Sequence, residues 1–281
     1  NDTENPDEPW EEILDESFSA KNKNVLVHMP RGALGDTLAW FPYIIAFGKK
    51  HECNRTVIRK EDCSHLWQKN YPEITIIDPQ DNIDQKKFYA TYRVGVFYHD
   101  DNNTWSPRDY RFMGLHHIAA EVLGLPHDIQ KTKIVATQGE ILPPEQPYVC
   151  IAVQSTMKAK LWNNPQGWII LVNFLIQSGY RVLCIDRERA TGKDANWNTI
   201  PFGCEDWTGA RPLTERADLL SKAAFFVGLP SGLSWLAWSV DCPTVMIAGF
   251  SDESAEFKPT IRIQNPIPCH SCWSDNRVMF D

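Results

Sequence analysis

The sequence predicts an α/β fold of two Rossmann-like, doubly wound parallel sheets that face a cleft. Short apolar segments alternate with amphipathic segments along most of the 281 residues, and this alternation is typical of parallel strands joined by crossover helices. A chain longer than about 250 residues usually divides into two domains. The polar, proline-bearing stretch at 143–147 separates two alternating sets, so we interpret it as a linker.

The expected domains follow from that linker. They are an acidic lead-in at 1–22, a first domain at 23–142, the linker at 143–147, a second domain at 148–264 and a tail at 265–281. Apolar, β-branched runs predict strands at 25–28, 55–58, 74–77, 92–97, 148–153, 181–185, 225–228 and 244–247. Helical spacing of apolar residues predicts helices at 38–47, 63–71, 111–123, 165–178, 213–224 and 233–239.

Composition excludes several classes of protein. The chain has 28 Lys and Arg against 36 Asp and Glu, a formal net charge of -8, and no basic run, which argues against a nucleic-acid surface. No apolar stretch approaches the roughly 20 residues that span a bilayer. The acidic N-terminus does not resemble a signal peptide, so we expect no membrane span and a cytoplasmic location.

The first candidate for chemistry is Asp36. It ends a turn, Gly32-Ala33-Leu34-Gly35-Asp36, which follows the apolar strand at 25–28. A carboxylate there faces the edge where α/β sheets bind ligands, and glycine lets the backbone approach a ligand closely. The spacing fits neither the dinucleotide fingerprint nor the P-loop. The alternative is that Asp36 only caps the following helix.

Two further loops suit an anion. After the strand at 148–153, the hydroxyls of Ser155 and Thr156 and the ammonium of Lys160 are suited to a diphosphate, unless Lys160 is only a solvated loop lysine. After the strand at 225–228, Ser231-Gly232-Leu233 opens a helix whose free N–H groups attract anions, unless Ser231 is only an N-cap. A nucleoside diphosphate bound there would face Asp36 across the cleft.

Glu205 and Asp206 end a short predicted strand, where a carboxylate commonly holds ribose hydroxyls. The residues leave the choice between them open. Tryptophans flank the proposed loops and belong either to the core or to a sugar-binding face. They are Trp40, Trp162, Trp235 and Trp238.

The eight cysteines have two kinds of setting. Cys150 and Cys184 lie within apolar runs and are interpreted as buried thiols. Cys269 and Cys272 have the spacing of metal ligands, but one such pair supplies half of a tetrahedral site. The two thiols are either an incomplete metal site or unmetallated surface groups.

Together these motifs resemble the heptosyltransferase superfamily, glycosyltransferases of GT-B architecture, from about Val25 onward. The specific likeness is to the bacterial autotransporter heptosyltransferases. It rests on Gly32-Ala33-Leu34-Gly35-Asp36-Thr37-Leu38-Ala39-Trp40-Phe41-Pro42-Tyr43, Gln154-Ser155-Thr156-Met157, Trp162-Asn163-Asn164-Pro165 and Cys269-His270-Ser271-Cys272-Trp273. The Leu-Ser-Trp turn ending at Trp235 also favours this branch, since the related lipopolysaccharide enzymes have His there.

The resemblance implies an inverting transferase that moves heptose from ADP-heptose to serines of an autotransporter adhesin passenger domain in the cytoplasm of a Gram-negative bacterium. Asp36 takes the position of the general base and Lys160 that of the diphosphate contact, with no catalytic metal. The implied donor-binding residues are Gly35, Thr37, Ser155, Thr156, Lys160, Asp206, Ser231, Gly232 and Leu233, of which Asp206 is the looser match.

The resemblance also implies a structural iron, or zinc, held in part by Cys269 and Cys272 and completed in the branch by further C-terminal cysteines. Members form rings of subunits, which predicts a homo-oligomer for the full-length form. Two other functions stay open. One is a lipopolysaccharide-core heptosyltransferase, and the other is a non-catalytic module that binds a nucleotide sugar or an adhesin.

Overall fold

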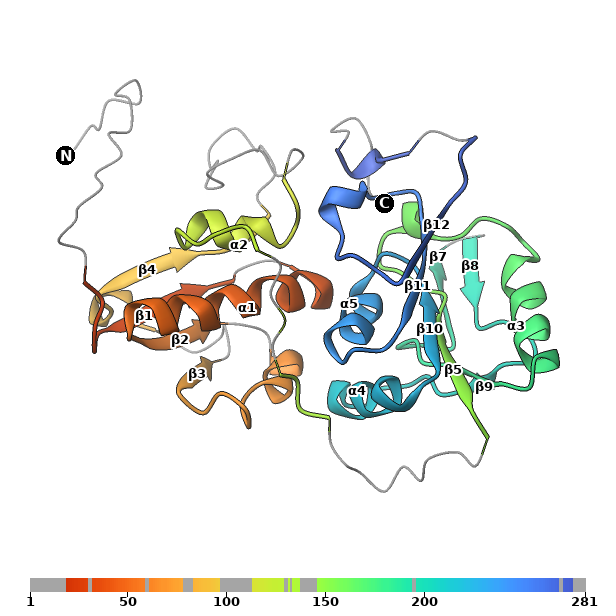
Figure 1. Cartoon of the computed structure of the whole chain (residues 1–281), viewed down its shortest axis with the longest axis horizontal. Coiled ribbons are helices and arrows are strands. Elements are labelled where there is room, and N and C mark those ends of the chain that lie inside the picture. The colour runs from red at the N-terminus through yellow and green to blue at the C-terminus, as the bar shows by residue number, and fades with distance from the viewer. Residues whose placement is uncertain are drawn as a thin grey trace.

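The computed structural model contains two parallel sheets, each with its own helices (Figure 1). It describes residues 19–29, 32–58, 61–77, 83–96, 113–128, 131, 133–136, 146–193, 196–267 and 270–274. The expected α/β architecture is therefore confirmed. The expected linker, lead-in and tail lie partly outside the described residues, so the domain bounds remain predictions.

The first sheet has the order β3-β2-β1-β4, and every pairing in it is parallel. Its strands are β1 (Asn24–His28), β2 (Asn54–Ile58), β3 (Ile74–Ile77) and β4 (Ala90–Arg93). Its helices are α1 (Leu34–His51) and α2 (His117–Val122), with short 3₁₀ helices at Glu61–Leu66 and Gln85–Lys87.

The second sheet has the order β12-β11-β10-β5-β6-β9, again with parallel pairings throughout. Its strands are β5 (Tyr148–Ala152), β6 (Arg181–Cys184), β9 (Glu205–Asp206), β10 (Phe225–Gly228), β11 (Thr244–Ala248) and β12 (Ile261–Gln264). Its helices are α3 (Gly167–Gln177), α4 (Leu213–Lys222) and α5 (Gly232–Ser239), and 3₁₀ helices lie at Lys158–Lys160, Glu253–Ala255 and Cys272–Ser274. An antiparallel hairpin, β7 (Ala190–Lys193) with β8 (Asn196–Thr199), lies between β6 and β9.

The structure differs from the sequence prediction at several elements. Helix α1 begins at Leu34 rather than at 38, because the Asp36 carboxylate accepts a hydrogen bond from the Ala33 N–H and closes the first turn. Residues 63–71 form a 3₁₀ helix and turns rather than an α-helix, and the strand expected at 92–97 is β4 at Ala90–Arg93. Of the helix expected at 111–123, α2 accounts for His117–Val122, and residues 111–112 lie outside the described part.

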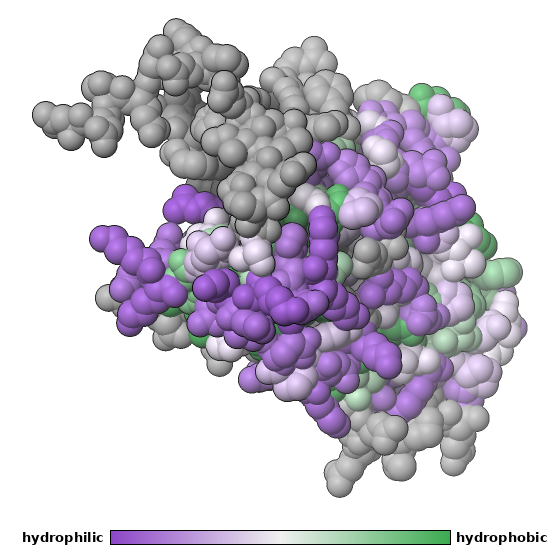
Figure 2. All heavy atoms as spheres, turned by 60° about the vertical axis from the view of Figure 1, so that its left-hand side comes forward, coloured by the Kyte–Doolittle hydropathy of each residue, from purple (hydrophilic) through white to green (hydrophobic). Residues whose placement is uncertain are grey.

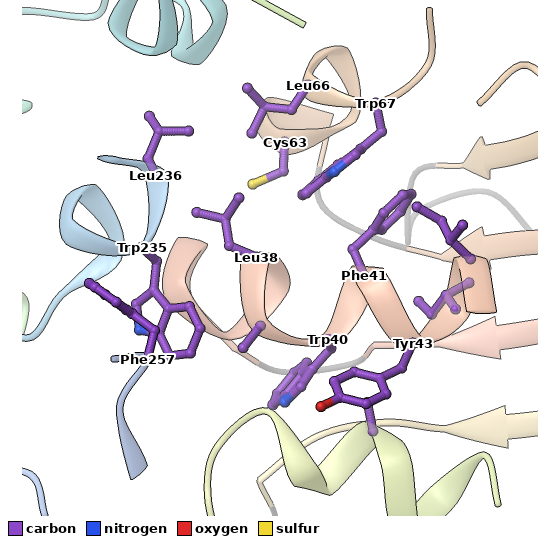
Figure 3. Packing of buried hydrophobic residues seen from close by; sticks show 14 of the residues in the cluster. Leu38, Trp40, Phe41, Tyr43, Cys63, Leu66, Trp67, Trp235, Leu236 and Phe257 are labelled. Carbon is purple, nitrogen blue, oxygen red and sulfur yellow. The ribbon is translucent and has the colours of Figure 1, made fainter. Parts of the chain in front are cut away.

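One apolar core runs across both halves. Along β5, Cys150 packs into the core shared with α1, while Val149 and Ile151 point to the opposite face, against α3. Helices therefore cover both faces of the second sheet, as a fully buried parallel strand requires. Figure 3 shows the shared core, in which Phe41 and Trp67 stack at 4.0 Å and Trp235 comes from α5.

The described surface is largely polar. On the face in Figure 2 the described residues are mainly hydrophilic, with small hydrophobic areas between them. Among the described helices, none combines the length and the apolar character needed to cross a membrane.

Candidate functional site

The N-termini of α1 and α5 meet where the two halves join (Figure 1). A Cβ added to Gly35 would lie 3.0 Å from Trp235 Cδ1 and 3.5 Å from Gly232 Cα, and one added to Gly232 would lie 2.8 Å from Leu34 Cβ. Two residues without side chains therefore allow this contact. Because a helix N-terminus carries unpaired N–H groups and a partial positive charge, the junction favours an anion.

Asp36 is the third residue of α1, half-buried at this junction. One carboxylate oxygen, Oδ2, accepts a hydrogen bond from the Ala33 N–H. Gly32 has φ at +126° and packs closely against Asp36, because a Cβ added to Gly32 would lie 3.0 Å from Asp36 Cβ. The capping role that we kept as the alternative is thus present. It also fixes the direction of the carboxylate, so capping and chemistry are compatible.

Lys160 ends the 3₁₀ helix that follows β5, and it is held near two carboxylates. Burial lowers the pKa of its ammonium, while the charges of Asp36 and Glu256 raise it. The ammonium lies 5.7 Å from the centre of the Phe250 ring. Lys160 is half-buried, and charged groups from both halves act on it, which argues against a solvated loop lysine.

Ser231 occupies the N-cap of α5 in extended conformation, but its hydroxyl makes no capping hydrogen bond. Its carbonyl accepts from the N–H groups of Ser234 and Trp235, at 3.1 and 3.3 Å. The N–H groups of Gly232 and Leu233 precede the helical bonding pattern. The Ser231 hydroxyl therefore does not serve as an N-cap, and the predicted role of these groups in anion binding stays a prediction.

The other predicted donor residues have different settings. Thr37 is fully buried, and its hydroxyl donates to the Ala33 carbonyl at 3.1 Å, so the structure does not bring it to the junction surface. Ser155 Oγ accepts from the Met157 N–H at 3.3 Å and shapes the loop, while Thr156 is exposed.

Asp186, which the sequence analysis missed, supports the start of this loop. Its carboxylate accepts from the N–H groups of Val153 at 2.8 Å and Gln154 at 3.3 Å. Burial raises the pKa of Asp186, although these hydrogen bonds and the charge of Arg216 act against the increase. Its sequence signal was an acid placed directly after the apolar run at 181–185.

Asp206 lies apart from this group. Its Oδ1 accepts from the N–H and hydroxyl of Thr208, at 3.0 and 2.6 Å, and these bonds hold the Asp206 pKa below its usual value. Strands β5 and β6 separate β9 from β10, a span of about 14 Å at the usual strand spacing. Neighbouring Glu205 forms two hydrogen bonds of 2.6 Å with Arg181, which leaves Asp206 the more available of the two acids.

Glu256 is a second charged residue that the sequence analysis missed. Its side chain is 3% exposed, and Oε2 accepts from Arg262 Nε at 2.8 Å. Burial raises the Glu256 pKa, and the charges of Arg262 and Lys160 oppose this. No local motif marks it, because its interest comes from the tertiary fold, in which its charge raises the pKa of Lys160.

The tail offers few metal ligands among the residues described. Cys272 is half-buried and His270 Nε2 is buried without a hydrogen-bond partner, but Cys269 lies outside the described residues. In the part of the chain with assigned positions, no group of three or more His, Cys, Asp or Glu could hold a metal ion. These residues alone do not fit a complete structural iron or zinc site.

Comparison with known proteins finds a matching family and several similar proteins. Glycosyltransferase family 9 (heptosyltransferase) matches residues 114–267. Autotransporter heptosyltransferase Aah of Escherichia coli is 45% identical over 270 residues, which cover 96% of this chain and 68% of that protein. The inactive autotransporter heptosyltransferase BimC of Burkholderia thailandensis is 35% identical over 94% of this chain and 62% of its own length.

A solved structure gives the same result for the fold. The iron-containing dodecameric glycosyltransferase TibC of enterotoxigenic E. coli H10407 is 43% identical, with a TM-score of 0.86 over 95% of this chain and 69% of that one. A second TibC structure, also at 0.86, is a complex with ADP-D-β-D-heptose. The chain thus spans about two thirds of the length of these relatives.

Proposed function

We propose that this chain, which belongs to the autotransporter heptosyltransferases of glycosyltransferase family 9, transfers heptose from ADP-heptose to serine hydroxyls of an autotransporter adhesin. The observation that carries the proposal is that Asp36 lies in the first turn of α1, where Gly35 and Gly232 let the starts of α1 and α5 meet. The charge of Asp36 also raises the pKa of Lys160 from the other half. The ADP-heptose complex of TibC supports the choice of donor.

In the proposed reaction, Asp36 accepts the proton of the acceptor serine as the serine oxygen attacks the anomeric carbon. The bond from that carbon to the diphosphate oxygen breaks, and ADP leaves from the opposite face with its electron pair. The new glycosidic bond therefore has inverted configuration. The Ala33 N–H bound to Oδ2 keeps the carboxylate oriented, and general-base assistance is worth roughly 10²- to 10⁴-fold in rate.

The departing diphosphate needs positive charge. Lys160 supplies an ammonium, and the start of α5 supplies the Ser231 hydroxyl and the N–H groups of Gly232 and Leu233. These groups stabilise the leaving ADP without a metal ion. Asp206 is the proposed ribose contact at the far edge of the sheet, which requires an extended nucleotide.

Partners and location belong to the same proposal. The adhesin would be modified in the bacterial cytoplasm before export, and the full-length form would be a homo-oligomer, as the dodecameric state named for TibC suggests. Cys269 and Cys272 are our proposed ligands for a structural iron or zinc. Because the described residues supply too few donors, the mechanism passes no step through a metal.

The test is to incubate the chain with ADP-heptose and an adhesin passenger fragment and to follow intact mass. We expect heptose mass increments that fall at least about 100-fold with Asp36→Asn, a change that keeps an oxygen for the Ala33 N–H. Asp84→Asn is the matched control, since Asp84 also caps a short helix, by accepting from the Lys86 N–H at 3.1 Å. Full activity of Asp36→Asn would rule out the base.

The same assay tests the cation. Lys160→Met should lower kcat and raise KM for the donor, whereas Lys158→Met, an exposed residue of the same 3₁₀ helix, should do neither. Equal effects of the two substitutions would contradict the role of Lys160.

A non-catalytic binding module is the second candidate, favoured by the inactivity stated in the name of the relative BimC. It predicts ADP binding without transfer to any acceptor. Calorimetry with ADP alongside the mass assay separates the two functions.

A further inference from the structure

Glu256 has one carboxylate oxygen in use and one unused. Oε2 accepts a hydrogen bond from Arg262 Nε. Oε1 is buried and has no hydrogen-bond partner among the described residues. An uncompensated buried carboxylate oxygen is unfavourable, so it persists where another feature of the structure requires it. The open acceptor needs an explanation.

The segment that carries Glu256 is anchored. Phe257 packs against Trp235 and Trp238 of α5, with ring centres at 5.0 and 5.4 Å. Arg262 of β12 also donates to the Ser251 carbonyl at 3.0 Å and to the Gln264 side chain. Turning the Glu256 side chain toward solvent would therefore break its hydrogen bond to Arg262, in a segment that Phe257 anchors to α5.

Lys160 lies close to this segment, because its ammonium is 5.7 Å from the centre of the Phe250 ring. The carbonyl of Ser251, the next residue, accepts from the Arg262 guanidinium that also binds Glu256. The two charges act on each other, since Glu256 raises the Lys160 pKa and Lys160 lowers that of Glu256. No hydrogen bond between these two described side chains is present in this structure. The lysine stem has four rotatable bonds, so its ammonium can reach a fixed acceptor nearby.

We propose that Glu256 is a positioning residue, which holds the Lys160 ammonium through Oε1 while the diphosphate departs. This inference rests on the proposed role of Lys160. Asp36 loses its negative charge when it accepts the serine proton, and it then no longer attracts Lys160. Glu256 stays charged throughout and keeps the ammonium aimed at the leaving group.

The surrounding charges decide the effect of pH. The charges of Asp36 on α1 and of Glu256 both raise the pKa of Lys160. Arg262 donates to Glu256 and lowers its pKa, and Asp252 raises it. Since burial lowers the Lys160 pKa, removing either carboxylate lowers it further. Loss of Glu256 should therefore move the alkaline limb of the rate profile to lower pH.

The main variant is Glu256→Gln, which keeps the side-chain shape and an oxygen for Arg262 Nε but removes the charge. We expect kcat to fall roughly ten- to a hundredfold, with a smaller change in KM for the donor and an alkaline limb shifted to lower pH. Glu256→Asp should recover part of the rate and the wild-type limb, because the charge returns. Glu253→Gln, an exposed glutamate in the same segment, is the control and should change neither.

A double variant separates positioning from a merely structural role. In a Lys160→Met background, Glu256→Gln should lower the rate no further, because its effect acts through the lysine. An equal loss in both backgrounds, or a wild-type rate profile for Glu256→Gln alone, would overturn the inference.

ADP titration calorimetry keeps this result distinct from failure of the proposed function. If the wild type transfers no heptose, the transferase proposal fails. The positioning role is still supported if Glu256→Gln weakens ADP binding in the wild-type background but not in the Lys160→Met background. Unchanged ADP binding in that case would overturn it.

Discussion

Protonation of one buried histidine should weaken the junction between the two halves in mild acid. His116 is 3% exposed at the start of α2, and neither ring nitrogen has a hydrogen-bond partner in the described structure. Its ring lies 4.0 Å from that of His117 and 6.4 Å from that of Trp235. Burial, then the charges of His117 and His127, lowers the His116 pKa from 6.5 to about 4.

The sign and size of the effect follow from that shift. Because the folded pKa lies below the unfolded one, the neutral ring stabilises the fold above pH 6.5, and this stability is lost as the pH falls toward 4. The difference between the folded and unfolded pKa of His116 corresponds to about 3 kcal/mol of unfolding free energy, of which about 2 kcal/mol is lost by about pH 5. Other groups titrate as well, so a variant must isolate this one.

His116→Phe keeps an aromatic ring but has no nitrogen to protonate. We expect its free energy of unfolding, from urea titrations followed by tryptophan fluorescence, to fall by about 2 kcal/mol less than that of the wild type between about pH 7.5 and about pH 5. Each protein is compared with itself, so a general loss of stability in the variant does not matter. His65→Phe, on an exposed position, should match the wild type. The same decrease for His116→Phe and the wild type would refute the reasoning.

Two further predictions concern the donor. Gly232→Ala puts a methyl group 2.8 Å from Leu34 Cβ, so calorimetry should show ADP binding weakened about tenfold or more. Gly249→Ala is the control, because its added methyl group has its nearest neighbour at 3.7 Å, and this variant should bind ADP normally. Asp206→Asn keeps an oxygen for Thr208 but removes the charge, so KM for the donor should rise severalfold with kcat unchanged in the steady-state assay; a fall in kcat alone would contradict a ribose contact.

The pattern of apolar residues and glycines predicted the elements whose structure depends on nearby residues. Apolar strands such as β1 and β5 and the glycine turn before Asp36 were evident in the residues, because burial and backbone freedom leave a direct signal. Strand β12 was missed because it alternates exposed Ile261 and Ile263 with polar residues at the edge of its sheet. The hairpin β7–β8 is polar and also carries no apolar run.

The site itself was only partly predictable, since tertiary pairing assembles it. Loop position alone makes Asp36 and Lys160 candidates, but Glu256 becomes a candidate only when β12 and Arg262 fold beside it. Asp206 shows the opposite case. Its motif is local, but the strand order that separates it from α5 cannot be read from the sequence.

The junction explains how the proposed base and the proposed cation can come from different halves. A catalytic pair divided between two bodies would be imprecise if those bodies moved freely. Here Trp235 packs within the same core as α1, next to the glycines that let the two helix starts meet. The packing that fixes α5 against α1 therefore also sets the position of Asp36 relative to the proposed anion site at the start of α5. Substitutions such as Gly232→Ala should then alter donor binding without removing a single polar group.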